Sequence, residues 1–198
     1  LTVPVVGAGP ANTEFEVLTG MSMQYFGTGE YPYKTILKQT DCESIADDLS
    51  QIGYGTHVVH NNTATFYSRN NAFSMMGFDT FTSKECMNIS QYTPNGNWPT
   101  DDVLVQETVK AMNATENQSD FVYTITVEGH GDYPTEKLLE NPDILVSGAA
   151  DEASNNQWEY YVNMIHEVDD FIGDLITAVD RRGEDTIIFQ RWDSPMRI

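Results

Sequence analysis

Two short stretches of this sequence carry the side chains best suited to chemistry on a phosphate group. The first covers residues 60–69 and contains Asn62, Tyr67 and Arg69, and the second places His130 between two glycines. An arginine guanidinium is a planar donor that matches phosphate oxygens, and a tyrosine ring is a surface on which a glycerol or a sugar can rest. A histidine can hydrogen-bond a phosphate or act as a general acid. These residue types indicate a phosphate-handling site.

Both stretches also have a structural interpretation. Spacing alone favours Arg69 as the partner of one of the thirty acidic residues. A lone histidine is more often structural or solvated than catalytic. However, His130 follows a predicted strand and stands beside Glu128 and Asp132. Ligands of open α/β sheets bind beyond the carboxyl ends of strands, so this position favours a functional role for His130.

The start of the chain predicts a binding position for an anion. Residues 7–20 begin with two glycines and a proline and continue into an acidic stretch. Asn12 or Thr13 can cap a helix there, acidic residues from Glu14 onward fall in its first turn, and Gly20 can end it in a left-handed conformation. The free backbone N–H groups of such a helix start point at one place, which suits a phosphate.

The motifs resemble those of one enzyme family. They read Ala-Asn-Thr-Glu-Phe at residues 11–15, Phe-Tyr-Ser-Arg-Asn at residues 66–70 and Glu-Gly-His-Gly-Asp-Tyr-Pro at residues 128–134. In wording and order they resemble the lipoteichoic acid synthase branch of the sulfatase and alkaline-phosphatase superfamily, and the likeness extends over residues 6–189. The resemblance implies a three-layer α/β/α sandwich with a mostly parallel sheet.

The resemblance also implies roles for individual residues. Asn62, Tyr67 and Arg69 fall on positions that contact a phosphoglycerol unit in the family, and His130 falls on a histidine that contacts the phosphoryl group or the leaving oxygen. The nucleophilic threonine of the family corresponds to Pro10. Proline has no hydroxyl and no N–H, so it can be neither a nucleophile nor a metal ligand.

Metal binding is doubtful on the same comparison. The family uses a divalent metal, usually Mn²⁺, held partly by an Asp-His pair after a strand that corresponds to residues 185–189. Here residues 190–198 follow, in which Asp193 is the nearest carboxylate, and the neighbouring residues do not match the family pattern. His166 and Asp170 have helical i, i+4 spacing, but such a pair is far more often a solvated pair than a metal site. We therefore assign no metal ligand in this chain.

Composition sets further limits. The 198 residues suit one domain, and we expect residues 1–198 to form a single sulfatase-like domain fragment of a truncated or frame-shifted gene, without the first strand and the carboxyl-terminal part. A formal charge of −20 argues against nucleic acid or an anionic membrane surface as a partner. Cys42 and Cys86 are either one disulfide or two buried thiols. No apolar run is long enough to cross a membrane.

The order of patterns predicts an α/β fold. Helices are expected over residues 41–52, capped by Asp41, after a cap at Thr100, and over residues 149–182. Strands are expected over residues 55–60, 119–127 and 185–189. Residues 81–97 and 136–148 are expected to be irregular. Alternation of helix, glycine and strand is typical of this fold class.

Three functional hypotheses follow. The first is an extracellular phosphoglycerol transferase or phosphodiesterase that acts on lipid- or polymer-linked glycerol phosphate, with impaired turnover because of Pro10. The second is a non-catalytic fragment that binds a phosphate or polyol group. The third is an esterase-like hydrolase that uses His130. The expected ligand is glycerol phosphate or a phospholipid head group, the expected location is the outer face of a bacterial membrane, and uncovered sheet edges predict a homodimer.

Overall fold

The computed structural model describes residues 9–191 and contains a three-stranded parallel sheet in the order β2-β1-β3. The central strand β1 (Gly55–His60) pairs with β2 (Thr80–Ser83) on one side and with β3 (Asp120–Ile125) on the other. All six residues of β1 are buried. A strand buried on both faces needs cover from two layers, and the run of β-branched residues in β1 fits that environment.

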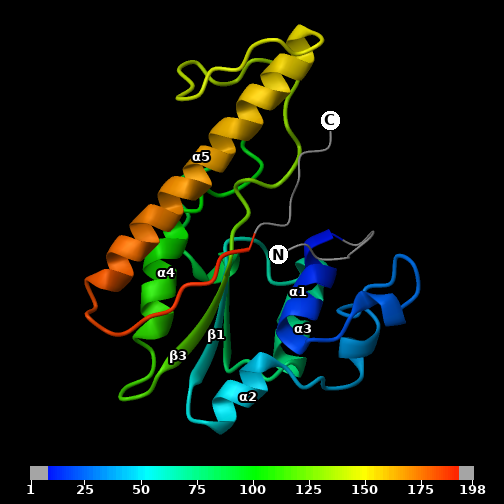
Figure 1. Ribbon diagram of the computed structural model, residues 1–198, viewed down its shortest axis with the longest axis vertical. Helices are drawn as coiled ribbons and strands as arrows, with labels where there is room; N and C mark the ends of the chain where they lie inside the picture. The colour runs from blue at the N-terminus through cyan, green and yellow to red at the C-terminus, as the bar shows by residue number, and fades with distance from the viewer. Residues whose placement is uncertain (1–8, 192–198) are drawn as a thin grey trace.

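Helices cover both faces of the sheet (Figure 1). On one face lie α1 (Gly9–Thr19), α2 (Ile45–Gln51) and α3 (Arg69–Met75). On the other lie α4 (Val103–Met112) and the long α5 (Glu152–Asp180). The three-layer α/β/α class and the parallel sheet that the sequence predicts are confirmed.

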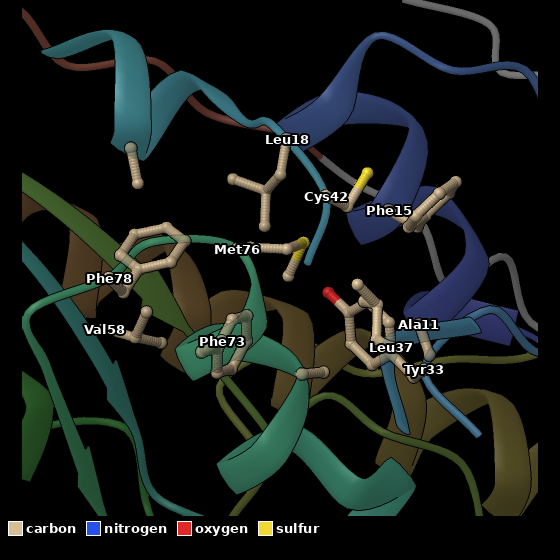
Figure 2. Packing of buried hydrophobic residues seen from close by; sticks show 12 residues of the cluster. Ala11, Phe15, Leu18, Tyr33, Leu37, Cys42, Val58, Phe73, Met76 and Phe78 are labelled. Carbon is tan, nitrogen blue, oxygen red and sulfur yellow. The ribbon is translucent and has the colours of Figure 1, made fainter. Parts of the chain in front are cut away.

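Two neighbouring valines of β1 belong to two separate cores. Val58 packs with apolar side chains of α1, α3 and the segment between α1 and α2, while Val59 packs with Leu104 of α4 and Phe171 of α5. Figure 2 shows the first core, in which Leu18 of α1 lies above Met76 and Phe73 lies below it. Successive strand residues point to opposite faces, so one strand organises both layers.

The helix α1 begins earlier than the capping pattern predicts. It starts at Gly9, so Asn12 and Thr13 lie inside it and are not caps, and Gly7 lies outside the described residues. The Nδ2 of Asn12 instead donates to the backbone oxygen of Glu30 at 2.8 Å. Proline suits the first turn of a helix because its missing N–H needs no partner there, which explains the early start. Gly20 has the predicted positive φ, +70°.

The caps of α2 and α4 also differ from the prediction. Ser44 caps α2 in a capping box with Asp47, so the assignment of Asp41 is wrong. Helix α4 begins at Val103 with Asp102 at the N-cap position, so Thr100 is not the cap. A serine followed three residues later by an acid satisfies two backbone N–H groups at once, which outweighs a single aspartate placed earlier.

Two strand predictions are wrong. Residues 80–83 form β2, although the sequence there predicts irregular structure, and residues 185–189 form no strand. In that second segment Ile187 and Phe189 are 80% and 92% exposed. Both errors have one cause, because a strand is stabilised by its hydrogen-bonded neighbour: polar β2 has β1 beside it, whereas no β-pairing is described for residues 185–189.

The other predicted elements agree with the structure. Residues 55–60 form β1, β3 lies within the predicted strand 119–127, and α5 lies within the predicted helix 149–182. Residues 136–148 contain no helix or strand. Cys42 is buried, Cys86 is exposed, and both are free thiols, so neither the disulfide nor the alternative of two buried thiols holds. Within residues 9–191, no helix combines the length and the apolar character that a bilayer span requires.

Candidate functional site

The candidate site lies at the carboxyl ends of β1 and β3, where α/β sheets bind ligands. His60 is the last residue of β1, and its Nδ1 lies 2.8 Å from the backbone oxygen of Ile125, the last residue of β3. A hydrogen bond to a carbonyl oxygen requires a proton on Nδ1, so Nε2 is left as an acceptor. His60 therefore joins the two strand ends in a defined tautomer.

The other ring nitrogen of His60 faces Arg69. The Nη1 of Arg69 donates to Nε2 of His60 at 3.3 Å, while its Nε and Nη2 donate to the two carboxylate oxygens of Glu14 at 3.1 Å and 2.5 Å. Glu14 and Arg69 are only 1% and 2% exposed. The two-point contact matches the geometry of a guanidinium to that of a carboxylate, which compensates for much of the cost of burying both charges. This buried triad of Glu14, Arg69 and His60 links α1, β1 and α3.

The arginine also fixes the charge of His60. Burial, then the Arg69 charge, lowers the pKa of His60 to about 3, and His130 contributes in the same direction. His60 is thus neutral at physiological pH, in agreement with the tautomer that its hydrogen bonds require. Because His130 acts electrostatically on the histidine that touches Arg69, both predicted site residues lie around one imidazole.

Tyr67 lies beside the triad in an uncommon backbone conformation. Its φ is +57° and that of Ser68 is +60°. Non-glycine residues rarely adopt such values, and the strain tends to be retained where a side chain must be placed. The ring centroid lies 5.2 Å from the guanidinium carbon of Arg69 and 5.4 Å from the Lys34 ammonium. The hydroxyl lies 3.6 Å from where a Cβ on Gly9 would stand, next to the start of α1.

His130 is half-buried against Trp98. The two rings meet edge to face with centroids 5.0 Å apart, and Trp98 Nε1 donates to the backbone oxygen of Gly131 at 3.2 Å. Asn95 and Asn97 donate to the backbone and side-chain oxygens of Asp132. The segment before α4 therefore holds the glycine-rich loop that carries His130.

A pair of buried acids holds the base of the same loop. Asp101 accepts from the backbone N–H groups of Val127 at 3.0 Å and of Glu128 at 3.3 Å, while Oε2 of Glu128 accepts from the Asp101 N–H at 2.7 Å. Asn61 adds a hydrogen bond to Asp101 at 2.8 Å. Burial raises the pKa of Asp101 to about 6 and that of Glu128 to about 8.

Of the four predicted site residues, Tyr67 and Arg69 lie against each other, and His130 is near enough to His60, the hydrogen-bond partner of Arg69, to act on it electrostatically. Asn62 turns into its own loop and accepts from the N–H of Thr63 at 2.7 Å. Two important partners were not predicted. Glu14 was read as a first-turn acid although it pairs with Arg69, and nothing in the spacing links Asp101 to Glu128. The Glu of the Thr-Glu-Phe motif is the one signal that pointed to Glu14.

The described residues do not fit a metal ion. Among residues 9–191, no group of three or more His, Cys, Asp or Glu side chains is arranged to hold one. Pro10, at the position of the family nucleophile, has no donor atom on its side chain. The exposed pair of His166 and Asp170 on α5 is 3.9 Å apart. Asp193 lies outside the described residues. We therefore derive no step through a metal.

A parallel sheet covered on both faces, with an arginine, a tyrosine and histidines near its carboxyl edge, defines a three-layer α/β/α protein. The family model described as Sulfatase matches residues 3–190, so the chain belongs to the sulfatase family.

Three comparisons with individual proteins support this assignment. The chain is 30% identical over 185 residues to a Rhizobium meliloti (strain 1021) protein named "Putative cyclic beta-1,2-glucan modification protein", covering 93% of this chain and 28% of that protein. It resembles the fold of the Streptococcus pyogenes phosphoglycerol transferase GacH, solved with sn-glycerol-1-phosphate (TM-score 0.73, 19% identity, 91% of this chain and 47% of that one). Its fold also resembles that of the lipoteichoic acid synthase LtaP from Listeria monocytogenes (TM-score 0.71, 21% identity, covering 91% of this chain and 42% of LtaP). The chain thus spans less than half the length of each of these relatives.

Proposed function

We propose that this chain binds the phosphoglycerol head group of a lipid or polymer at the carboxyl edge of its sheet. The neighbourhood of Arg69 carries the proposal, because its guanidinium lies against the Tyr67 ring and donates to His60, a histidine on which His130 acts electrostatically. GacH was solved with sn-glycerol-1-phosphate, which supports the same ligand chemistry here. The relative named for glucan modification supports a polyhydroxylated polymer as the other substrate.

The three side chains have different tasks in this proposal. Arg69 is already neutralised by Glu14, so its contribution is to hold Tyr67 and His60 in place. Tyr67 forms a wall for the glycerol carbons, and its hydroxyl lies beside the first N–H groups of α1. His130 donates a hydrogen bond to a phosphoryl oxygen. The backbone N–H groups of α1 then complete the anion site.

Turnover by the usual route of the family is expected to be weak or absent in this chain. Pro10 cannot attack phosphorus because it has no hydroxyl. The alternative of a non-catalytic binding module is separated from the enzyme by titration with Mn²⁺ alone. A stoichiometric site of micromolar affinity would support an enzyme, whereas an absence of binding heat would support the module.

Calorimetric titration with sn-glycerol-1-phosphate tests the binding proposal. We expect saturable binding that weakens by at least about tenfold in His130→Ala and in Tyr67→Ala, since each removes one direct contact. His166→Ala is the matched control, because His166 is a partly exposed histidine on α5 away from the sheet edge. An absence of binding, or equal losses in the control and in the site variants, would overturn the proposal.

The proposal also covers the location of the protein and its oligomeric state. We propose that the head group is met at the outer face of a bacterial membrane, as the resemblance implies. We also propose a homodimer in which an edge strand of the described sheet, β2 or β3, pairs with a second copy, because such edges carry unpaired backbone groups. Light scattering that shows a monomer at high protein concentration would contradict the dimer.

A further inference from the structure

A hollow lies beside Glu128, at the base of the loop that carries His130. It has a volume of about 220 Å³ and lies between the middle of α5, residues 139–143 and the segment before α4. Tyr67, Arg69 and His130 are not among its lining residues. Its polar lining consists of three carboxyl groups, three amides and one hydroxyl: Glu128, Asp143, Glu167, Gln91, Asn141, Asn163 and Thr100.

Glu128 gives this hollow a built-in binding group. Its side chain is 4% exposed and lines the hollow, and its described hydrogen bond, from the Asp101 N–H, uses Oε2. The carboxyl group also lines the hollow, where it can hydrogen-bond a ligand or water that enters.

We propose that this hollow binds a neutral polyol, such as one glycerol or one hexose unit. At roughly 30 Å³ for each water, a volume of about 220 Å³ replaces about seven water molecules, which suits one small polyol and not a polymer segment. A hydroxyl group both donates and accepts, so it matches a lining that mixes carboxylates with Gln91, Asn141 and Thr100. Leu139 and Met164 supply an apolar surface for its C–H groups.

Other ligand classes fit this lining less well. An anion such as glycerol phosphate would be repelled by the carboxylates of Asp143 and Glu167. A metal ion would need three donors arranged around one point, and the described residues contain no such group. An organic ammonium ion only donates hydrogen bonds, so it would leave the amide donors of Gln91 and Asn141 without acceptors. This inference uses none of the side chains that contact the ligand in the proposed phosphoglycerol site and does not depend on that site.

Ligand-observed NMR on the whole chain tests the inference with glycerol, glucose and methylammonium as probes. We expect glycerol and glucose to bind and methylammonium not to bind. Leu139→Trp fills the hollow and should weaken polyol binding by at least about tenfold. Leu138→Trp is the matched control, since the neighbouring Leu138 does not line this hollow and should leave polyol binding unchanged.

A second variant guards against a trivial effect of the large side chain. Glu167→Gln changes only the charge and the hydrogen bonding of one lining group on α5, and it should weaken polyol binding several-fold. Both lining variants should retain binding of sn-glycerol-1-phosphate, so failure of the first site and failure of the second are distinguishable. Tighter binding of methylammonium than of glycerol, no polyol binding, or binding unaffected by Leu139→Trp would each overturn the inference.

Discussion

Two buried acidic groups lie at the same edge of the sheet and are stabilised in opposite ways. Glu14 meets the guanidinium of Arg69 through two hydrogen bonds. Asp101 and Glu128 form no ion pair within residues 9–191 and are held by backbone N–H groups and by Asn61. The first group is paired with a cation, whereas burial raises the pKa values of the second.

Because of this difference, the two sides of the site respond differently to pH. Burial, together with the Arg69 charge, keeps His60 neutral down to about pH 3, so this histidine does not titrate in the physiological range. The pKa values of Asp101 and Glu128, raised to about 6 and about 8, place their proton uptake within that range. The loop that carries His130 therefore rests on a pH-sensitive support.

The largest expected effect comes from removing the cation. Arg69→Met leaves the Glu14 carboxylate buried without a counter-charge and should lower the free energy of unfolding by about 3–5 kcal/mol. Urea denaturation at pH 7 measures this loss. The double variant Glu14→Gln with Arg69→Met should recover a substantial part of the stability, because no charge is then left unpaired. A loss below about 1 kcal/mol in the single variant would contradict a tightly coupled pair.

A smaller loss is expected from the acid pair. Asp101→Ala removes the acceptor of the Val127 and Glu128 N–H groups and should cost about 2–4 kcal/mol, since buried donors are left unsatisfied. Asp102→Ala is the matched control, because Asp102 is the next residue, is exposed and makes no side-chain cap. This variant should lower the free energy of unfolding by less than about 1 kcal/mol. Equal losses in the two variants in urea denaturation would contradict this role of Asp101.

Local patterns explain why much of the fold could be predicted. The β-branched residues 55–60 and the long periodic stretch of α5 depend on neighbours in sequence, and both were found. Residues 80–83 and 185–189 show the limit: the first is polar yet becomes β2, and the second is apolar yet forms no strand. Pairing partners far away in the chain decide both cases.

The candidate site was predictable only where motifs carried it. Tyr67, Arg69 and His130 were found through their resemblance to a family, and in the structure Arg69 contacts both Tyr67 and His60. The pairing of Glu14 with Arg69 spans 55 residues, and that of Asp101 with Glu128 spans 27 residues. No periodicity links such distant acids to their partners, so neither pair could be found without the tertiary structure.

The pH dependence of stability is the next test of the comparison. The pKa of Glu128 is about 8 in the fold against an ordinary value of 4.5, so the folded state retains a proton that the unfolded state releases. Its stabilising contribution is complete below pH 4.5 and is lost as the pH rises through about 8. The slope is up to about 1.4 kcal/mol for each pH unit. Urea denaturation between pH 5 and pH 8 should show this fall.

The variant Glu128→Gln isolates the titrating group. It keeps an amide oxygen for the Asp101 N–H but cannot lose a proton, so the fall in stability between pH 6 and pH 8 should flatten. Glu140 is an exposed residue of the 136–148 loop, so Glu140→Gln should show the same fall in the free energy of unfolding with pH as the unaltered chain. An unchanged slope in Glu128→Gln would place the pH sensitivity elsewhere.

The smallest expected effect concerns Trp98, which supports the His130 loop from its other end. Trp98→Phe keeps an aromatic ring beside His130 but removes the Nε1 donor to the Gly131 oxygen, so the free energy of unfolding should fall by about 1 kcal/mol. Hydrogen exchange should become faster at residues 130–133 and stay unchanged in β3, because Asp101 still holds the base of the loop. The matched control Trp158→Phe, on α5, should leave exchange in that loop unaltered. Faster exchange throughout β3 in Trp98→Phe would show that the tryptophan, and not the acid pair, is the main support of His130.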